Sequence, residues 1–443
     1  GIDILKGEAY DSPQKPFGGD EDYIWSPDSK SILYVAKKKA GTQYAISTNT
    51  DIYEYNLATG KTINRTEGNL GYDTAPQFSP EGNLTWLQMK RDGYEADKND
   101  LIVDFKGQKM NLTANWDGTV ESYKWSVDGK KIYFIAAVDG TKQLFEVNFP
   151  GLTRIAIRVS QITKGDFDVN EIIGFTANNV LVTRGDMNHA AEIFSYDLKK
   201  NDWKQITNVN TDVYKTLALS KTERRYVTTT DGKKMLVWVI LPPNFDATKK
   251  YPTLLYCQGG PQSALTQFYS FRWNFQLMAA NGYIVVAPNR RGMPGHGVEW
   301  NEQISKDWGG QVMDDYLSAI DDVSKESYVD NSRLGCVGAS YGGYSAFYLA
   351  GIHENRFKTF IAHDGVFNTQ SMFGTTEEVF FNNWDFGGAY WEKDNAVAQK
   401  TYTTFNPITL VDKWNAPILM QETEKKLNQW HFVWVELDEL HGM

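Results

Sequence analysis

The sequence predicts two successive fold classes in one chain: an all-β repeat region, followed by an α/β domain with a mostly parallel sheet. The first class rests on a repeat of about 50 residues that runs through residues 1–207. The second rests on strand-like apolar runs that alternate with helical patterns from about residue 226 onward. We place the domains at residues 1–215 and 216–443.

Each repeat of the first half begins with an aromatic residue in front of a small polar turn. The turns lie in YIWSPDSK, QFSPEGN, YKWSVDGK and GFTANN, and the aromatic anchors are Trp25, Phe78, Trp125 and Phe175. Alternating strands such as SILYVA and KIYFIAA follow the turns. Four short strands per repeat, joined by Asp-Gly and Pro-Asp turns, are typical of a β-propeller blade. The sequence therefore predicts about four blades, the later part of a larger propeller.

The many aromatic residues of this half allow two interpretations. They could stack on sugars at a carbohydrate-binding surface, or they could pack between neighbouring blades. The anchors occupy a fixed place in front of each turn. This regularity favours packing between blades.

Composition limits the classes of function. With 443 residues, of which 41% are hydrophobic, the chain can bury more than one core. A formal net charge of -10 argues against a nucleic-acid partner, because nucleic-acid binders carry basic patches. No apolar run approaches the roughly 18–20 residues of a membrane-spanning helix. Cys257 and Cys336 lie in apolar strand-like runs, which favours buried free thiols over a disulfide.

The second half alternates strands with helices. Strand-like runs such as TLLYCQGG, GYIVVAPN, RLGCVGAS and KTFIAHDG are separated by helical segments. In residues 311–326, Val312, Tyr316, Ile320 and Val323 share one helical face. This alternation predicts a mostly parallel sheet covered by helices on both faces.

A serine framed by glycines lies between one of these strands and the next helix. In GASYGGY, the pattern Gly338-x-Ser340-x-Gly342 follows the strand RLGCV and precedes the helical run YSAFYLAGI. Glycines weaken an ordinary helix or strand. In a nucleophile elbow they make room for a strained serine whose hydroxyl is exposed at the carboxyl end of the sheet. The pattern predicts Ser340 as a nucleophile in an α/β-hydrolase domain.

A nucleophilic serine needs a histidine base, which the hydrolase fold places after the serine and after an acid. Four histidines follow Ser340: His353, His363, His431 and His441. The first ends the helix of the serine, the second lies in the next strand and the third opens the last strand. His441 follows that last strand in the loop ELDELHGM, at the carboxyl edge of the predicted sheet. We therefore predict His441 as the base.

In these motifs the chain resembles the prolyl oligopeptidase family of serine peptidases. The resemblance spans nearly the whole chain and includes the propeller turns, YCQGGPQ, APNRRGMPGHG, DWGGQVMDD, GASYGGY and DELHGM. Within the family, the chain is most similar to the bacterial dipeptidyl peptidase V group and its acylaminoacyl-peptidase relatives. The resemblance implies release of N-terminal dipeptides from oligopeptides by acyl-enzyme hydrolysis. The alternatives are an acylaminoacyl peptidase or oligopeptidase of the same family and, more remotely, an esterase.

The resemblance also implies how the substrate is held. The backbone N–H of Tyr341 and the loop Gln258-Gly259-Gly260 are the expected oxyanion donors. Gln258 stands where proline-specific relatives carry a tyrosine, which leaves open which atom donates. The expected substrate-binding walls are Tyr341, Val366, Phe367 and Met372, of which Phe367 and Met372 could equally be plain core. Such an apolar pocket predicts a hydrophobic or small side chain at the P1 position.

The family places its catalytic aspartate shortly after the strand matched by APILM, and here the sequence departs from the pattern. Only QETEKKLNQW separates Met420 from His431, whereas a parallel crossover needs a dozen or more residues. The sequence also ends two residues after His441. We therefore expect that stretches are omitted and that the catalytic aspartate falls in one of them near Met420. Asp438 is too close to His441 in sequence to orient it comfortably, and Asp412 precedes the strand. Glu422 and Glu424 are the fallback candidates for the acid.

Few other partners are expected. The sequence has no HExxH motif and no pair of histidines at helical spacing, so we expect neither a metal nor a cofactor. Oligopeptides are the expected substrates, and a homodimer is compatible with the sequence. The first residues, GIDILKGEAY, have no basic leader, so we expect that any signal peptide was removed or never present. The resemblance favours the periplasm or secretion over the cytoplasm.

Overall fold

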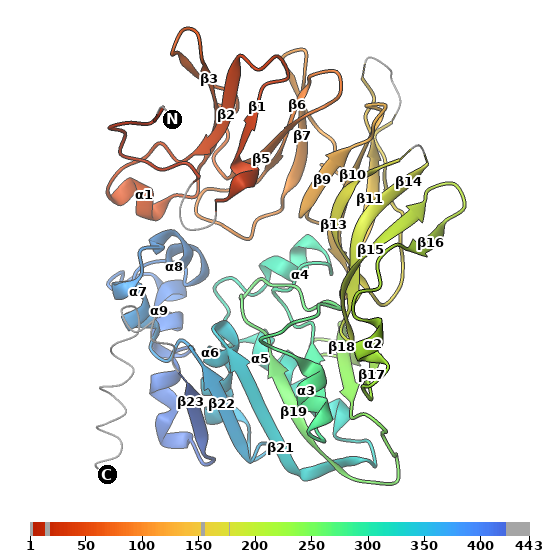
Figure 1. The fold of residues 1–443 in the computed structure, drawn as a ribbon. Helices are drawn as coiled ribbons and strands as arrows, with labels where there is room; N and C mark the ends of the chain where they lie inside the picture. Colours follow the sequence, from red (N-terminus) through yellow and green to blue (C-terminus); the bar gives the residue numbers. More distant parts are fainter. Residues whose placement is uncertain (1–2, 14–17, 152–155, 177, 422–443) are drawn as a thin grey trace.

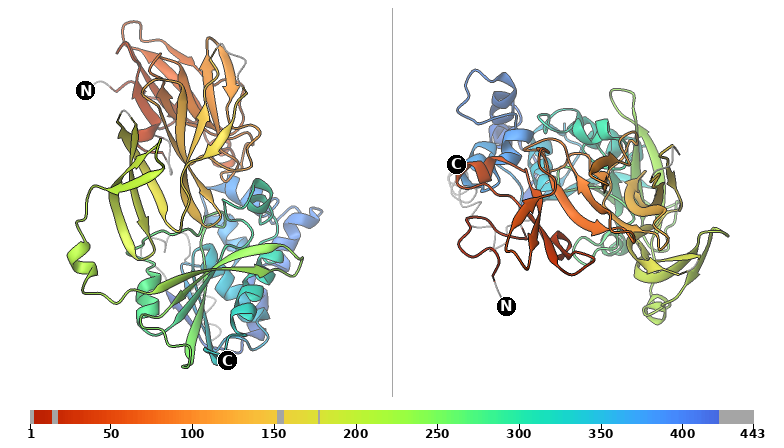
Figure 2. Two further views of the ribbon diagram at one scale, coloured as in Figure 1. Left: turned by 90° about the vertical axis from the view of Figure 1, so that its right-hand side faces the viewer. Right: turned by 90° about the horizontal axis from the view of Figure 1, so that it is seen from above.

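The computed structural model of the chain describes residues 3–13, 18–151, 156–176 and 178–421. Four antiparallel sheets of four strands each come from the first half, and one seven-stranded sheet with its helices comes from the second (Figure 1). The four sheets lie side by side in an arc at one end of the molecule, and the seven-stranded sheet lies at the other (Figure 2). The two predicted fold classes are confirmed.

The four small sheets are the predicted blades, and each is a meander of consecutive strands. The first is β1 (Tyr23–Trp25), β2 (Ser31–Ala36), β3 (Asp51–Asn56) and β4 (Thr62–Asn64); the second is β5 (Asp73–Phe78), β6 (Leu84–Gln88), β7 (Asp100–Phe105) and β8 (Gln108–Asn111). The third is β9 (Ser122–Trp125), β10 (Lys131–Val138), β11 (Thr141–Asn148) and β12 (Val159–Gln161); the fourth is β13 (Asp168–Phe175), β14 (Asn179–Asp186), β15 (His189–Asp197) and β16 (Asp202–Gln205). Each predicted aromatic anchor is the last residue of the first strand of its blade.

In the first and third blades, the polar turn after the anchor closes the first hairpin by side-chain hydrogen bonds. In the first blade, the Ser26 hydroxyl donates to Asp28 at 2.8 Å and accepts the Ser31 N–H at 2.9 Å. In the third blade, Ser126 makes the same two bonds, to Asp128 at 2.8 Å and from Lys131 at 3.0 Å. The sequence repeat therefore reflects a repeated turn structure.

Aromatic side chains join neighbouring blades, as the interblade interpretation predicts. The Tyr123 hydroxyl of the third blade is within hydrogen-bonding distance of the backbone oxygens of Ala75 (2.7 Å) and Thr85 (2.8 Å) in the second blade. The indole N–H of Trp125 donates to the Thr85 hydroxyl at 3.0 Å. Trp25, in the first blade, is instead 60% exposed.

The seven-stranded sheet has the order β17-β18-β20-β19-β21-β22-β23. Its strands are β17 (Lys221–Thr228), β18 (Lys234–Leu241), β19 (Tyr251–Cys257), β20 (Ile284–Pro288), β21 (Val329–Ala339), β22 (Thr359–His363) and β23 (Ile418–Gln421). The neighbouring strands β20, β19, β21, β22 and β23 pair in parallel. At the other end of the sheet, β18 pairs antiparallel with both β17 and β20. The carboxyl ends of the parallel strands therefore meet along one edge, where a hydrolase site belongs.

Helices cover both faces of this sheet. Core residues of α5 (Gln311–Val323) and α6 (Tyr341–Ile352) pack in one cluster with one face, and residues of α3 (Phe275–Ala280) pack in another cluster with the opposite face. The predicted apolar face of residues 311–326 is buried. The other helices in the described ranges are α1 (Thr42–Ile46), α2 (Thr211–Tyr214), α4 (Val298–Glu302), α7 (Thr369–Thr375), α8 (Val379–Asp385) and α9 (Ala396–Thr403), with 3₁₀ segments at Asp20–Asp22 and Pro407–Lys413.

Two further expectations can be compared with the structure. Cys257 and Cys336 are buried free thiols on neighbouring strands, with their sulfur atoms 3.6 Å apart, as predicted. None of the helices in the described ranges has the length and apolar character that crossing a membrane requires.

Candidate active site

Ser340 lies in a sharp turn between a strand and a helix. β21 ends at Ala339 and α6 begins at Tyr341, so the serine is the only residue between them. Its backbone has φ 57° and ψ -122°, a conformation that a residue with a side chain rarely adopts. The turn is held by the Ser340 N–H, which donates to the His363 oxygen at 2.9 Å, and by the Ser340 oxygen, which accepts the Tyr344 N–H at 3.0 Å. This is the geometry of a nucleophile elbow.

The glycines around the serine are required by close backbone contacts. A Cβ atom on Gly338 would overlap the Gly342 oxygen, and one on Gly342 would overlap the Cys257 oxygen. A Cβ atom on Gly343 would lie 2.6 Å from the Gly365 Cα atom. Backbone atoms of a central strand and helix cannot move aside cheaply, so each of these positions needs glycine. This explains the composition of GASYGGY.

The predicted oxyanion donors flank the serine. Tyr341 is the first residue of α6, where a backbone N–H has no partner within the helix. On the other side, the loop after β19 approaches so closely that a Cβ atom on Gly259 would lie 3.6 Å from the Ser340 Cβ atom. The Gln258 amide donates to the Ser263 hydroxyl at 3.4 Å. Backbone N–H groups thus come from two elements next to the predicted nucleophile.

Arg290, which sequence reasoning missed, holds this loop. Its side chain is fully buried and donates to the backbone oxygens of Pro261 at 2.6 Å and Gln258 at 3.1 Å. It also donates to the Tyr316 hydroxyl at 2.9 Å, and its guanidinium lies 4.7 Å from the centre of the Tyr341 ring. One cation therefore links the loop to the first residue of α6. The only sequence signal was an arginine pair directly after a strand, in APNRRG.

The residues predicted as pocket walls lie mostly in the core. The Tyr341 ring is 1% exposed, its hydroxyl donates to the Trp308 oxygen at 3.0 Å, and burial raises the pKa of Tyr341 well above its usual value. Val366 and Phe367 are buried, and Met372 packs against the same core cluster. Tyr341, Val366 and Phe367 therefore have little surface for a substrate, whereas Met372 is only partly buried.

The predicted base lies outside the described residues. His441 is in the range 422–443, as are His431, Glu422, Glu424 and Asp438. Met420 lies in β23, next to β22, and Asp412 lies in the second 3₁₀ segment. His363 ends β22 beside the elbow, and His353 follows α6, where its Nε2 contacts the Asn415 amide oxygen at 2.8 Å. These two histidines lie in the strand and at the helix end that the sequence predicts.

A cavity of about 470 Å³ lies between the propeller and the loop beside the serine. The loop contributes Gly260 and Gln262, and the propeller contributes four acids among other residues: Glu21, Asp22, Glu95 and Glu121. Glu121 is paired with Lys142 at 2.5 Å. The cavity thus connects the surroundings of the elbow with an acidic part of the propeller.

Glu95 is an acid of this cavity whose pKa is strongly raised. Burial, together with the charges of Glu378 and Asp385, raises its pKa to about 8. Its carboxyl group has no hydrogen bond or ion pair within the described ranges. Burial also raises the pKa of Asp22 to about 6. Such a site favours a positively charged ligand group, because a cation would stabilise the ionised carboxylates.

Family models and known proteins match this architecture. Residues 269–425 match the model of the prolyl oligopeptidase family, and residues 21–250 match that of the TolB beta propeller domain. The chain is 48% identical over 425 residues to dipeptidyl-peptidase 5 of Porphyromonas gingivalis and 49% identical over 430 residues to that of Porphyromonas endodontalis. These alignments cover 95% and 96% of the chain but only 61% of each relative, so the chain spans about three fifths of their length.

A solved structure shows the same fold at lower sequence identity. The acylaminoacyl peptidase of Pyrococcus horikoshii matches with a TM-score of 0.78 at 20% identity, over 95% of this chain and 64% of that one. The shared order of a propeller followed by an α/β sheet agrees with both family models. The elbow, the glycine contacts and these matches lead to one conclusion: residues 269–425 are a domain of the prolyl oligopeptidase family, preceded by a propeller of the TolB type.

Proposed function

We propose that the full protein is a serine exopeptidase that releases N-terminal dipeptides from oligopeptides. The observation that carries this proposal is the acidic cavity beside the loop that flanks Ser340. A nucleophile alone fits any hydrolase of the fold, whereas a nearby uncompensated carboxylate selects a substrate with a free amine. Relatives named dipeptidyl-peptidase 5, which align with 95% of the chain, support the same activity.

The proposed chemistry is acyl transfer. His441, the predicted base, takes the proton of the Ser340 hydroxyl while the serine oxygen attacks the scissile carbonyl carbon. The oxyanion accepts hydrogen bonds from the Tyr341 N–H and from the loop at Gln258 and Gly259. The imidazolium then protonates the leaving amine, and water hydrolyses the acyl-enzyme by the same route. The acid that orients His441 is proposed to follow β23.

The propeller would set the length of the released fragment. Gly259 lies beside Ser340, where a Cβ atom on it would come within 3.6 Å of the Ser340 Cβ atom. Gly260 and Gln262 line the cavity that contains Glu95. A substrate with its scissile carbonyl at the serine can therefore extend its N-terminus toward Glu95. Its ammonium group would form an ion pair there and lower the pKa of Glu95 from about 8.

Specificity at P1 is proposed to be for a hydrophobic or small side chain, since apolar side chains dominate the surroundings of the elbow. We also propose that the protein works in the periplasm or outside the cell, as the similarity to the bacterial dipeptidyl peptidase V group favours. The substrates are then oligopeptides of that compartment.

The test compares a chromogenic dipeptidyl amide that has a hydrophobic P1 residue with its N-acetylated twin. We expect cleavage of the free amine only, and none by Ser340→Ala. Glu95→Gln should lower kcat/KM for the free amine roughly 30-fold or more, because loss of a buried charge partner costs about 2–5 kcal/mol. The matched control Glu171→Gln removes an exposed propeller acid and should change nothing.

Other outcomes would point to other functions. Preference for the acetylated substrate would make the protein an acylaminoacyl peptidase. Equal cleavage of both substrates would indicate an oligopeptidase without amine recognition, and would remove the role of Glu95. Activity that survives in Ser340→Ala would exclude the proposed nucleophile.

A further inference from the structure

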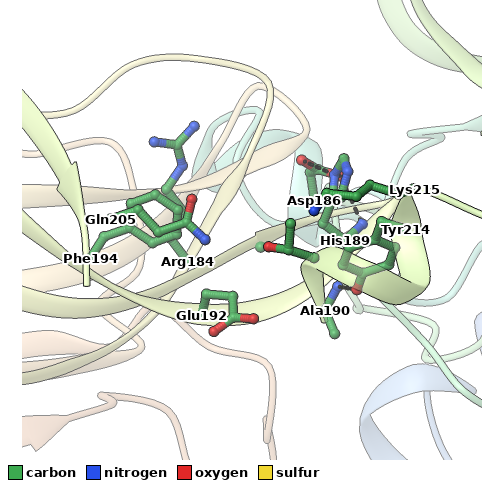
Figure 3. A pocket seen from close by; sticks show the side chains of 11 residues that line it. Arg184, Asp186, His189, Ala190, Glu192, Phe194, Gln205, Tyr214 and Lys215 are labelled. Atoms are coloured by element: carbon green, nitrogen blue, oxygen red, sulfur yellow. Dashed lines mark hydrogen bonds and ion pairs between the residues drawn. The ribbon is translucent and has the colours of Figure 1, made fainter. Parts of the chain in front are cut away.

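A second cavity of about 470 Å³ lies between the fourth blade and the segment around α2, and its lining residues come from residues 184–215 (Figure 3). We call it the blade-four cavity; its lining is Arg184, Gly185, Asp186, His189, Ala190, Glu192, Phe194, Gln205, Thr211, Tyr214 and Lys215. These residues come from β14, β15, β16 and the segment around α2. The elbow and the acidic cavity do not share any of them, so the proposed peptidase chemistry leaves this cavity without a role.

Arg184 is the unusual residue of the blade-four cavity. Its guanidinium carbon lies 3.8 Å from the centre of the Phe167 ring and 4.9 Å from those of Phe194 and Trp203. Burial against these rings lowers the pKa of Arg184. In the part of the chain that the structure describes, its side chain has no hydrogen-bond acceptor and no ion-pair partner. A guanidinium carries five N–H donors, so Arg184 can donate hydrogen bonds to a ligand bound in the cavity.

The acids of the lining do not form an ion pair or hydrogen bond with Arg184 in the described residues, although the charge of Asp186 partly offsets the effect of burial on the pKa of Arg184. Glu192 faces Arg184 across the β14–β15 pair, but its carboxylate accepts the Thr207 hydroxyl and the Asn210 N–H. Asp186 accepts hydrogen bonds from the Asn188 N–H and from the backbone and ring of His189. The cavity therefore holds opposite charges side by side without pairing them.

Further donors are available on the other side of the cavity. The Tyr214 oxygen accepts the Ala190 N–H at 2.7 Å, which leaves its own hydroxyl hydrogen for another acceptor. The His189 ring packs edge-on against Tyr214 at 4.9 Å and contacts Asp186 through Nδ1, which leaves Nε2 for a ligand. Figure 3 shows His189 and Tyr214 on one side of the cavity and Arg184 with Gln205 on the other.

We propose that the blade-four cavity binds a small monocarboxylate, whose two oxygens accept parallel N–H donors from Arg184. The planar fork of a guanidinium matches a carboxylate in this way. Glu192 and Asp186 disfavour a doubly charged phosphate, because their negative charges line the same cavity. Phe194 and Ala190 provide apolar contacts for a short side chain. The proposal does not depend on the peptidase activity.

The probes are N-acetylglycine, its neutral twin N-acetylglycinamide, and inorganic phosphate. Each is titrated calorimetrically into the full Ser340→Ala protein, so that turnover cannot contribute heat. We expect N-acetylglycine to bind at one site and the amide to bind at least about tenfold more weakly, because charge-assisted hydrogen bonds are lost. Equal binding of the amide would overturn the proposal. Phosphate binding as tight as that of the carboxylate would overturn the choice of ligand.

Variants locate the binding site. Arg184→Gln should weaken N-acetylglycine binding by about tenfold or more, and Arg184→Lys, which keeps the charge but not the fork, by a smaller factor. The control Arg333→Gln removes an exposed arginine whose partner is Asp330 and should leave binding unchanged. If Arg184→Gln fails to fold, Arg184→Lys decides the question. Binding that is unchanged in Arg184→Lys would then overturn the proposal.

Discussion

The two halves of the molecule differ in whether their structural features are repeated. The propeller repeats one turn structure: the turns at Ser26 and Ser126 make the same two hydrogen bonds in different blades. In the α/β half, the nucleophile elbow occurs once, at Ser340. Three glycines of this elbow fit against backbone atoms of other elements. A local change in the propeller should therefore be tolerated far better than one at the elbow.

The largest contrast is expected between two glycine substitutions. A Cβ atom at Gly342 would overlap the Cys257 oxygen, whereas one at Gly174, in β13, would have no atom within 4 Å. Gly342→Ala should abolish activity and lower the free energy of unfolding by about 3 kcal/mol or more, as overpacking against backbone does. Gly174→Ala should stay within about 0.5 kcal/mol of the wild type. Urea unfolding and kcat/KM measure both, and a fully active Gly342→Ala protein would refute the elbow contacts.

The next effect concerns Arg290, the cation that joins the predicted oxyanion loop to α6. Arg290→Met should lower kcat roughly 10- to 100-fold, since misplaced oxyanion donors stabilise the transition state less. KM should change little, and the affinity for a peptide aldehyde, which mimics the tetrahedral intermediate, should fall in step with kcat. Arg290→Lys should restore part of the loss. A lowered melting temperature with normal kcat would instead mean that Arg290 only stabilises the fold.

A pH effect distinguishes Glu95, the proposed amine-binding acid of the propeller, from its surface acids. The folded protein holds the Glu95 proton up to about pH 8, whereas the unfolded chain releases it near 4.5. The folded state therefore binds more protons in this window, and the free energy of unfolding falls as the pH rises from 4.5 to about 8. Glu95→Gln should be more stable than wild type near pH 8 and equal near pH 4.5. Glu171→Gln should show no such difference in urea unfolding at the two pH values.

The smallest effect should come from a single propeller turn. Ser126→Ala removes the hydroxyl that bonds Asp128 and Lys131, at a cost of about 1 kcal/mol. Activity should be unchanged, because the turn belongs to a repeated structure distant in sequence from the elbow. Urea unfolding and kcat/KM again provide the measurement. A loss of activity as large as that of Arg290→Met would contradict the contrast between the two halves.

The same contrast explains what the sequence could predict. The anchors Trp25 and Trp125 mark ends of strands because hairpin turns are local, and Ser340 was found because strand, glycines and helix are contiguous. Arg290 contacts segments far apart in the chain, and Glu95 lines a cavity built from such segments, so no local pattern showed the contacts of Arg290 or the proposed role of Glu95. Burial of Phe367 likewise depends on α6, while the predicted base, His441, lies outside the described residues.

The central claim is that Ser340 is the nucleophile, and covalent labelling tests it most directly. The full protein is treated with a fluorophosphonate, whose phosphorus bonds to an activated serine oxygen as fluoride leaves, and the adduct is located by mass spectrometry of peptides. We predict one adduct, on Ser340, which is absent in Ser340→Ala and coincides with loss of dipeptide release. An adduct on another residue, or full activity with Ser340 modified, would contradict the claim.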